Sequence, residues 1–106
     1  MERMANKGNQ MKADTKHDEW LFEQLKDANF AAEFLNAASE DDDPKTYLTA
    51  LRKVVEARGG ITSTAEKAQL SRETLYRTLS ARGNPTIKTL NAVLKATGLK
   101  FGVTAN

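Results

Sequence analysis

One short segment of the sequence carries hydrogen-bonding side chains of the types that read DNA. Arginine can bind O6 and N7 of guanine in a fork, glutamate can accept a hydrogen bond from N4 of cytosine, and hydroxyls bind bases or phosphates. Arginines in such segments contact phosphate at least as often as bases, so both roles stay open for the two arginines here. The predicted DNA-contacting residues are Ser71, Arg72, Glu73, Thr74 and Arg77.

Polar residues on both sides of this segment extend the predicted DNA surface. Backbone N–H groups at helix N-termini bind phosphate, and hydroxyl, amide and ammonium side chains near them add further contacts. For Ser63 and Thr86, capping of a helix is the structural alternative, and for Arg82 a plain surface position is. The further residues assigned to DNA are Ser63, Thr64, Arg82, Asn84 and Lys88.

Two short helices are needed to position these side chains. Ser63 followed by Glu66 has the spacing of a capping box, which predicts that one helix begins at Ser63. Ser71 is a second N-cap, with Leu75 and Leu79 one turn apart in the helix that it starts. Small and apolar residues between the two caps allow the helices to cross closely, so the segment has a helix-turn-helix pattern.

Apolar periodicity and capping residues predict further helices on both sides of this pattern. Asp43 before Pro44 is the clearest start, because aspartate caps a helix and proline suits its first position. These helices span 17–26, from the cap Asp27 to Ser39, from Pro44 to Gly59-Gly60, and from the cap Thr86 to Gly98. The expected fold is therefore an all-α bundle of five to six helices.

Charge is segregated along the 106 residues, although the net charge is only +2. Residues 17–43 hold one basic and nine acidic side chains, a net charge of −8, whereas residues 44–106 hold eleven basic and three acidic ones, a net charge of +8. Residues 1–16 have too few bulky apolar side chains to order and are predicted to be a disordered tail. We expect residues 17–43 to bind a protein partner and residues 44–106 to form the DNA-binding domain.

The acidic region is repelled by phosphate, so its partner should be a basic protein. Aromatic residues are enriched at the energetic centres of interfaces, although for Phe30 and Phe34 the core of the domain is the stronger alternative. The residues assigned to this partner surface are Glu19, Trp20, Phe22 and Glu23.

The end of the chain alternates apolar and other residues with a period of two, which is typical of a short strand. Leu99, Phe101 and Val103 form its apolar side. Because no other segment has a strand pattern, the expected partner is the same strand of a second copy, in a symmetric dimer. The alternative is an extended tail that packs on its own domain.

The sequence lacks the residues that several classes of function require. The chain has no cysteine and a single histidine, His17, so it lacks a disulfide framework, a thiol nucleophile and a cluster of soft metal ligands. The acidic run Asp41–Asp43 comes from one turn and lacks the convergence from separate elements that a catalytic site needs. We expect a cytoplasmic non-enzyme without cofactor, metal site, signal peptide or membrane span.

The order of these motifs resembles the addiction-module antidote family, the HigA-like antitoxins of bacterial type II toxin–antitoxin modules. The resemblance covers roughly residues 17–104 and rests on the segments 27–38, 43–44, 70–80 and 83–86. It implies a Cro/repressor-like DNA-binding domain, repression of the shared operon, and a partner toxin of the RelE/ParE type that acts as an RNase. Gln69 departs from the pattern, because many relatives have glycine at this turn position. A stand-alone repressor of the prophage type, without a toxin, is the alternative function.

Overall fold

The computed structural model describes residues 15–105, and all regular elements within this range are helices. The first helix covers residues 15–24. It is followed by α2 (Ala28–Ala38), α3 (Pro44–Ala57), α4 (Gly60–Ala68), α5 (Arg72–Thr78) and α6 (Ile87–Ala96). The prediction of an all-α fold with up to six helices is therefore confirmed for the described residues.

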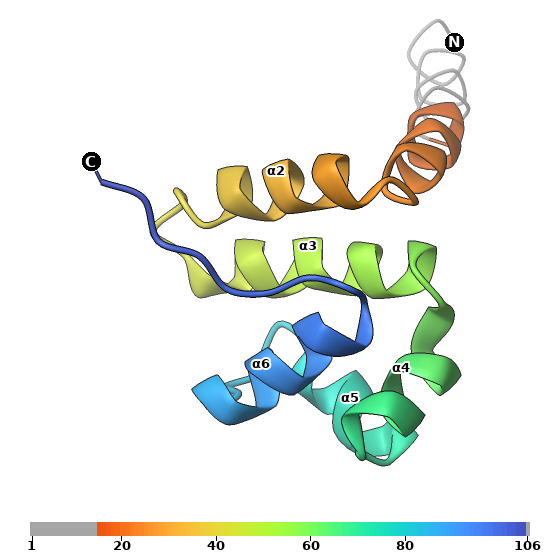
Figure 1. The fold of residues 1–106 in the computed structure, drawn as a ribbon, viewed down its shortest axis with the longest axis vertical. Coiled ribbons are helices and arrows are strands. Elements are labelled where there is room, and N and C mark those ends of the chain that lie inside the picture. Colours follow the sequence, from red (N-terminus) through yellow and green to blue (C-terminus); the bar gives the residue numbers. More distant parts are fainter. Residues whose placement is uncertain (1–14, 106) are drawn as a thin grey trace, which may run out of the picture.

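Helix α3 lies across the middle of the molecule and supplies much of its core. In Figure 1, helix 15–24 and α2 lie above α3, whereas α4, α5 and α6 lie below it. Helix α3 contacts α2 on one side and α4 on the other, and α4 in turn contacts α5 and α6. The buried side chains of α3 join both halves into one apolar cluster: Ala50, Leu51, Val54, Val55 and Ala57.

Arg58 ties the ends of three helices together. It is the C-cap residue of α3, and its guanidinium donates hydrogen bonds from Nε to the carbonyl of Thr97 (2.7 Å) and from Nη1 to the carbonyl of Lys26 (2.6 Å). These two carbonyls lie at the C-terminal ends of α6 and of helix 15–24, where backbone acceptors are left unpaired and the helix dipole favours a cation. Gly98 leaves room for this contact, since a Cβ there would lie 3.1 Å from the guanidinium.

Side-chain caps fix where four of the helices begin. Asp27 accepts a hydrogen bond from the N–H of Phe30. Asp43, the residue directly before Pro44, accepts one from the N–H of Lys45. Ser71 and Thr86 cap α5 and α6 in the same way. The predicted N-caps at these four positions are confirmed, because each side-chain oxygen pairs with an N–H that the helix leaves unsatisfied.

The predicted capping box at Ser63 is wrong. Helix α4 already begins at Gly60, with Gly59 as an N-cap that makes no side-chain hydrogen bond, so Ser63 and Glu66 lie inside the helix. Gly59 and Gly60 have positive φ angles of 124° and 87°, which glycine adopts at little cost. The chain therefore reverses within the two glycines, and no linker is needed before α4.

The turn between α4 and α5 places a residue other than glycine in a left-handed conformation. Gln69, the C-cap of α4, has φ 58° and ψ 43°. Such a conformation costs a side-chain-bearing residue about 1 kcal/mol relative to glycine. Gln69 is the one residue other than glycine with a positive φ among residues 15–105, and the turn keeps its geometry despite that cost.

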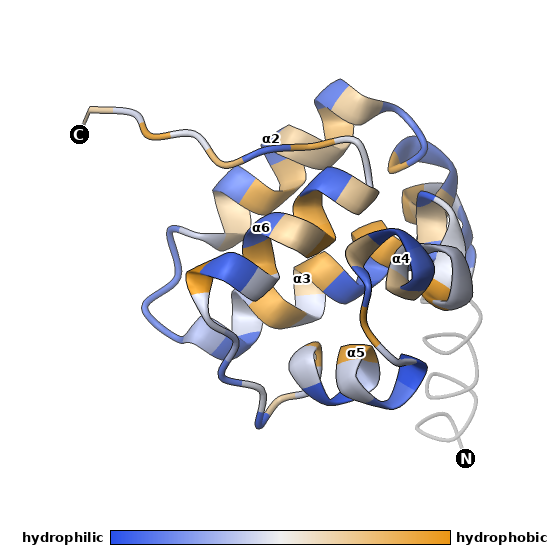
Figure 2. Cartoon of the chain, turned by 60° about the horizontal axis from the view of Figure 1, so that its bottom comes forward, coloured by the Kyte–Doolittle hydropathy of each residue, from blue (hydrophilic) through white to orange (hydrophobic). Residues whose placement is uncertain are grey.

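Residues 99–105 form no regular element in the single chain, so the predicted C-terminal strand is not formed there. A strand requires a neighbour for its N–H and C=O groups, and no strand is present among residues 15–105 to supply one. Leu99 packs against the core, while Phe101 is exposed and Val103 is 98% exposed. The tail leaves the body of the molecule after α6 (Figure 2).

The predicted tail over residues 1–16 needs one correction. The first helix includes residues 15 and 16, so it begins earlier than the expected position 17. Residues 1–14, with the rest of that predicted tail, lie outside the described residues.

Replacing Arg58 with leucine should destabilise the fold by about 1–3 kcal/mol, because two carbonyl acceptors lose a charged donor. The measurement is urea unfolding of the wild-type chain and of the Arg58→Leu variant. Arg82→Leu is the matched control, since Arg82 is an exposed loop residue. Equal stabilities for the Arg58 and Arg82 variants would contradict the role given to the guanidinium.

Candidate functional site

Helix α5 turns one apolar side inward and one charged side to solvent. Leu75, Thr78 and Leu79 are buried against the rest of the molecule. At 100° per residue, Glu73, Tyr76 and Arg77 lie on the opposite side of the helix, and Arg72 lies at the edge between the two sides. All four side chains are exposed. The structure therefore leaves three of the predicted DNA-contacting residues exposed on α5: Arg72, Glu73 and Arg77.

The other two predicted residues of this segment hold the helix start together. The Oγ of Ser71 accepts a hydrogen bond from the N–H of Thr74 (3.0 Å) and donates one to its Oγ1 (2.8 Å). The guanidinium of Arg77 lies 3.5 Å from the same Oγ1, at the limit of a hydrogen bond. Ser71 and Thr74 thus position the first two turns of α5, and Thr74 is half-buried.

The loop after α5 is packed tightly against the end of that helix. The N–H of Gly83 donates to the carbonyl of Ser80 (2.9 Å), and a Cβ at Gly83 would come within 2.1 Å of the carbonyl oxygen of Thr78, so only glycine fits. Arg82, Asn84 and Lys88 are all exposed on this loop and on the first turn of α6. Figure 2 views this end of the molecule, with α5 in front and the loop to α6 beside it.

The remaining two predicted DNA contacts lie on α4, and the structure removes one of them. Thr64 is 1% exposed, and its Oγ1 is buried without a hydrogen-bond partner. Thr64 and Ala65 are the buried residues of α4, so the side chain at position 64 faces the core and is not available to DNA. Ser63 is half-buried next to Gly59 and stays only a marginal candidate.

Sequence reasoning missed two residues at this surface. Tyr76 is 40% exposed on the outer face of α5, although a tyrosine at helical spacing packs more often than it contacts DNA. Its position four residues after Arg72 was the available signal, since residues four apart share a helix face. The Arg52 guanidinium lies 5.5 Å from the centre of the Tyr76 ring, a contact between residues 24 positions apart in the sequence that no local pattern reveals.

The first helix presents a second surface at the other end of the molecule. Leu21 and Leu25 are buried, so they define its inner side. At 100° per residue, the outer half carries two carboxylates flanked by an aromatic ring on each side. In order around the helix these are Phe22, Glu19, Glu23 and Trp20, and all four are exposed.

The two exposed aromatic rings are held by their neighbours. Trp20 is 51% exposed, stacks on His17 with ring centroids 5.9 Å apart, and meets the half-buried Phe30 edge-on at the same distance. The Lys26 ammonium lies 5.2 Å from the centre of the Phe22 ring and 2.9 Å from a carboxylate oxygen of Glu23. The rings therefore keep defined orientations while much of their surface stays open.

The half-buried rings of Phe30 and Phe34 pack against the core, which fits the core alternative given for them.

The carboxylates between α2 and α3 serve the backbone. Asp41 accepts hydrogen bonds from the N–H of Asp43 (2.8 Å) and from the hydroxyl of Thr46 (3.1 Å), while Asp43 caps α3. Among residues 15–105 no group of three or more His, Cys, Asp or Glu side chains is arranged to hold a metal ion. The carboxylates of Asp41 and Asp43 therefore stabilise the start of α3.

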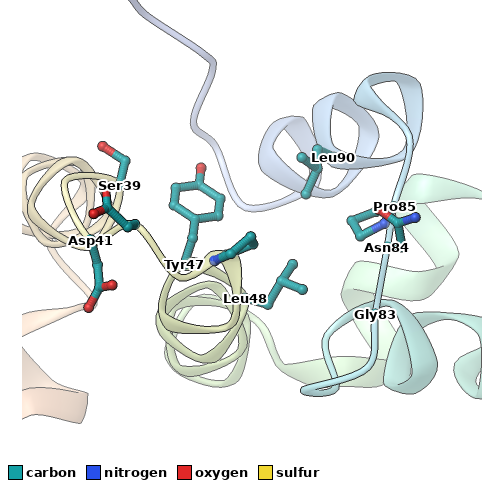
Figure 3. A pocket seen from close by; sticks show the side chains of 10 residues that line it. Ser39, Asp41, Tyr47, Leu48, Gly83, Asn84, Pro85 and Leu90 are labelled. Carbon is teal, nitrogen blue, oxygen red and sulfur yellow. The ribbon is translucent and has the colours of Figure 1, made fainter.

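A cleft of about 310 Å³ separates this link from the loop before α6 (Figure 3). Leu48 and Leu90 line it together with Tyr47, whose ring stands between the link and α6. Burial raises the pKa of the Tyr47 phenol, so this group stays neutral at physiological pH.

None of the described helices is long and apolar enough to cross a membrane.

Comparisons with known proteins place the chain in a family. The sequence model of a family described as "Probable addiction module antidote protein" matches residues 16–105. A Haemophilus influenzae protein described as "Uncharacterized protein" is 38% identical over 92 residues, which cover 78% of this chain and 94% of that protein. No solved structure matches the chain.

Proposed function

This chain belongs to the family of addiction-module antidote proteins, and from that premise we propose that it neutralises a partner toxin and represses its own operon by binding DNA. The single observation that carries the DNA-binding half is the exposed face of α5, which follows α4 after a three-residue turn. In a helix-turn-helix of the Cro/repressor type, the second helix enters the major groove with its N-terminal residues toward the bases.

The charged face of α5 has the chemistry that this role requires. Arg72 and Glu73 stand in its first turn, where base edges are reached, and Arg77 follows one turn later. Arg82, Asn84 and Lys88 are exposed beyond the C-terminal end of α5 and are assigned to phosphates. The function is regulatory rather than catalytic, and its site of action is the cytoplasmic operator DNA.

The outer half of helix 15–24 is proposed to bind the toxin. Residues 17–43 carry a net charge of −8, which favours a basic partner such as an RNase that binds an anionic substrate. Trp20 and Phe22 supply the apolar contacts on either side of Glu19 and Glu23. A toxin of the RelE/ParE type, as the HigA-like resemblance implies, fits this requirement.

Two copies of the chain are proposed to bind one operator. Phe101 and Val103 are exposed on a tail without a partner segment in the single chain, and pairing with a second copy would cover them. The operator would then be close to palindromic, with half-sites about 34 Å apart or a multiple of that distance. A stand-alone repressor would bind DNA in the same way, but it would leave the exposed carboxylates and aromatic rings of helix 15–24 without a binding partner.

Replacing Arg72 with alanine should weaken binding to the chain's own upstream DNA by about 1–3 kcal/mol if the guanidinium contacts a base. The measurement is a mobility shift with that duplex and with a scrambled duplex of equal length, at two salt concentrations. Lys95→Ala, an exposed residue at the far end of α6, is the control. An equal loss on both duplexes would reassign Arg72 to phosphate, and no loss on either would contradict the α5 interface.

Replacing Trp20 with alanine should weaken toxin binding by about 2 kcal/mol or more, roughly 30-fold, as expected for a central aromatic contact. Calorimetric titration with the purified toxin measures this, and the same variant should bind DNA like the wild-type chain. Ile87→Ala, which removes an exposed apolar side chain at the start of α6, is the matched control. Unchanged toxin affinity for the Trp20 variant would rule out the proposed surface.

A further inference from the structure

A charged side chain from α3 lies beside the outer face of α5. The guanidinium carbon of Arg52 is 5.5 Å from the centre of the Tyr76 ring, which is within the range of a cation–π contact. The two residues lie on different helices, and both are accessible: the Arg52 side chain is 44% exposed and Tyr76 is 40% exposed. This contact joins the surface of α3 to that of α5.

The Arg52 guanidinium is held in place while it remains open to a ligand. Its Nε lies 3.9 Å from a carboxylate oxygen of Glu56, a distance too long for a hydrogen bond. The centre of the Tyr76 ring lies 5.5 Å from the guanidinium carbon, within the range of a cation–π contact. An accessible arginine beside an aromatic ring is well suited to a phosphate, which it can bind with two parallel hydrogen bonds.

The position of Arg52 decides what it can reach. When α5 lies in the major groove, its first residues face the bases, and the sugar–phosphate backbones run along both sides of the helix. Arg52 comes from outside α5, from the neighbouring helix α3, so it lies beside the inserted helix rather than at its tip. The polar group of DNA available there is a phosphate.

We propose that Arg52 and Tyr76 form a phosphate-binding pair that extends the DNA surface from α5 onto α3, an inference that rests on the proposed function of α5. Arg52 binds the phosphate through its guanidinium, and Tyr76 orients Arg52 with its ring. Phosphates are present in every sequence, so this pair adds affinity and fixes the orientation of the protein without reading bases.

The salt dependence of DNA binding tests this pair. Each phosphate contact contributes about 0.9 to the slope of log affinity against log salt concentration, because a bound cation releases counterions. The Arg52→Gln variant should therefore show a slope smaller by about 0.9, with affinities for the upstream duplex and the scrambled duplex lowered by the same factor. Arg52→Lys keeps the charge and should keep the slope.

Lys53→Gln is the matched control, since it removes one positive charge from the adjacent residue. Lys53 is exposed and lines clefts with residues of helix 15–24 and α2, away from Tyr76. Its variant should keep the wild-type slope. Arg52→Met, which retains the apolar stem, is the second neutral variant, and thermal unfolding of all variants separates lost binding from lost folding.

An unchanged slope for both neutral Arg52 variants would overturn the inference, and so would an equal decrease for Lys53→Gln, which would indicate a general charge effect. Tyr76→Leu adds a second condition, because removal of the ring should lower affinity on both duplexes alike, and unchanged affinity would refute the supporting role of the ring. Failure of the proposed function would already be visible in the wild-type chain, as an absence of preference for its own upstream DNA.

Discussion

The hydrogen bonds of Arg58 set the geometry on which both proposed surfaces depend. This one guanidinium, at the end of α3, binds the carbonyl of Lys26 after the first helix and the carbonyl of Thr97 after α6. The acidic helix is thus fixed to the same point as the last helix of the basic half. The carbonyls at the ends of the first helix and of α6 would otherwise lack this charged donor, and the helix dipoles favour a cation at both ends.

The core around α3 and the hydrogen bonds of Arg58 hold helix 15–24 and α5 in fixed positions on opposite sides of α3. Helix α3 lies between the acidic helix and α5, with buried residues that pack in both directions (Figure 1). Charge follows the same division, since residues 17–43 are strongly acidic and residues 44–106 strongly basic. The proposed basic partner and the proposed DNA would consequently bind at opposite ends, and neither would need to displace the other.

Capping residues and helical periodicity in the sequence predicted the helices, because helix formation depends largely on interactions between residues close in the sequence. The caps at Asp27, Asp43, Ser71 and Thr86 and the helical periodicity located five helices, because these features act within one turn. The contact of Arg52 with Tyr76 joins two different helices and therefore has no local sequence signal. The start of α4 at Gly60 was missed although the two glycines are a local feature, because the spacing of Ser63 and Glu66 predicted a later start. The burial of Thr64 depends on how α4 packs against the core, which the spacing of caps does not determine.

We propose that one core carries two independent binding surfaces at opposite ends. Sedimentation of a labelled upstream duplex with this chain and with its purified partner toxin tests this most directly. We expect a single complex that contains all three components and sediments faster than the complex of the chain with DNA. Release of the DNA by saturating toxin, with formation of only a toxin–antidote complex, would contradict it.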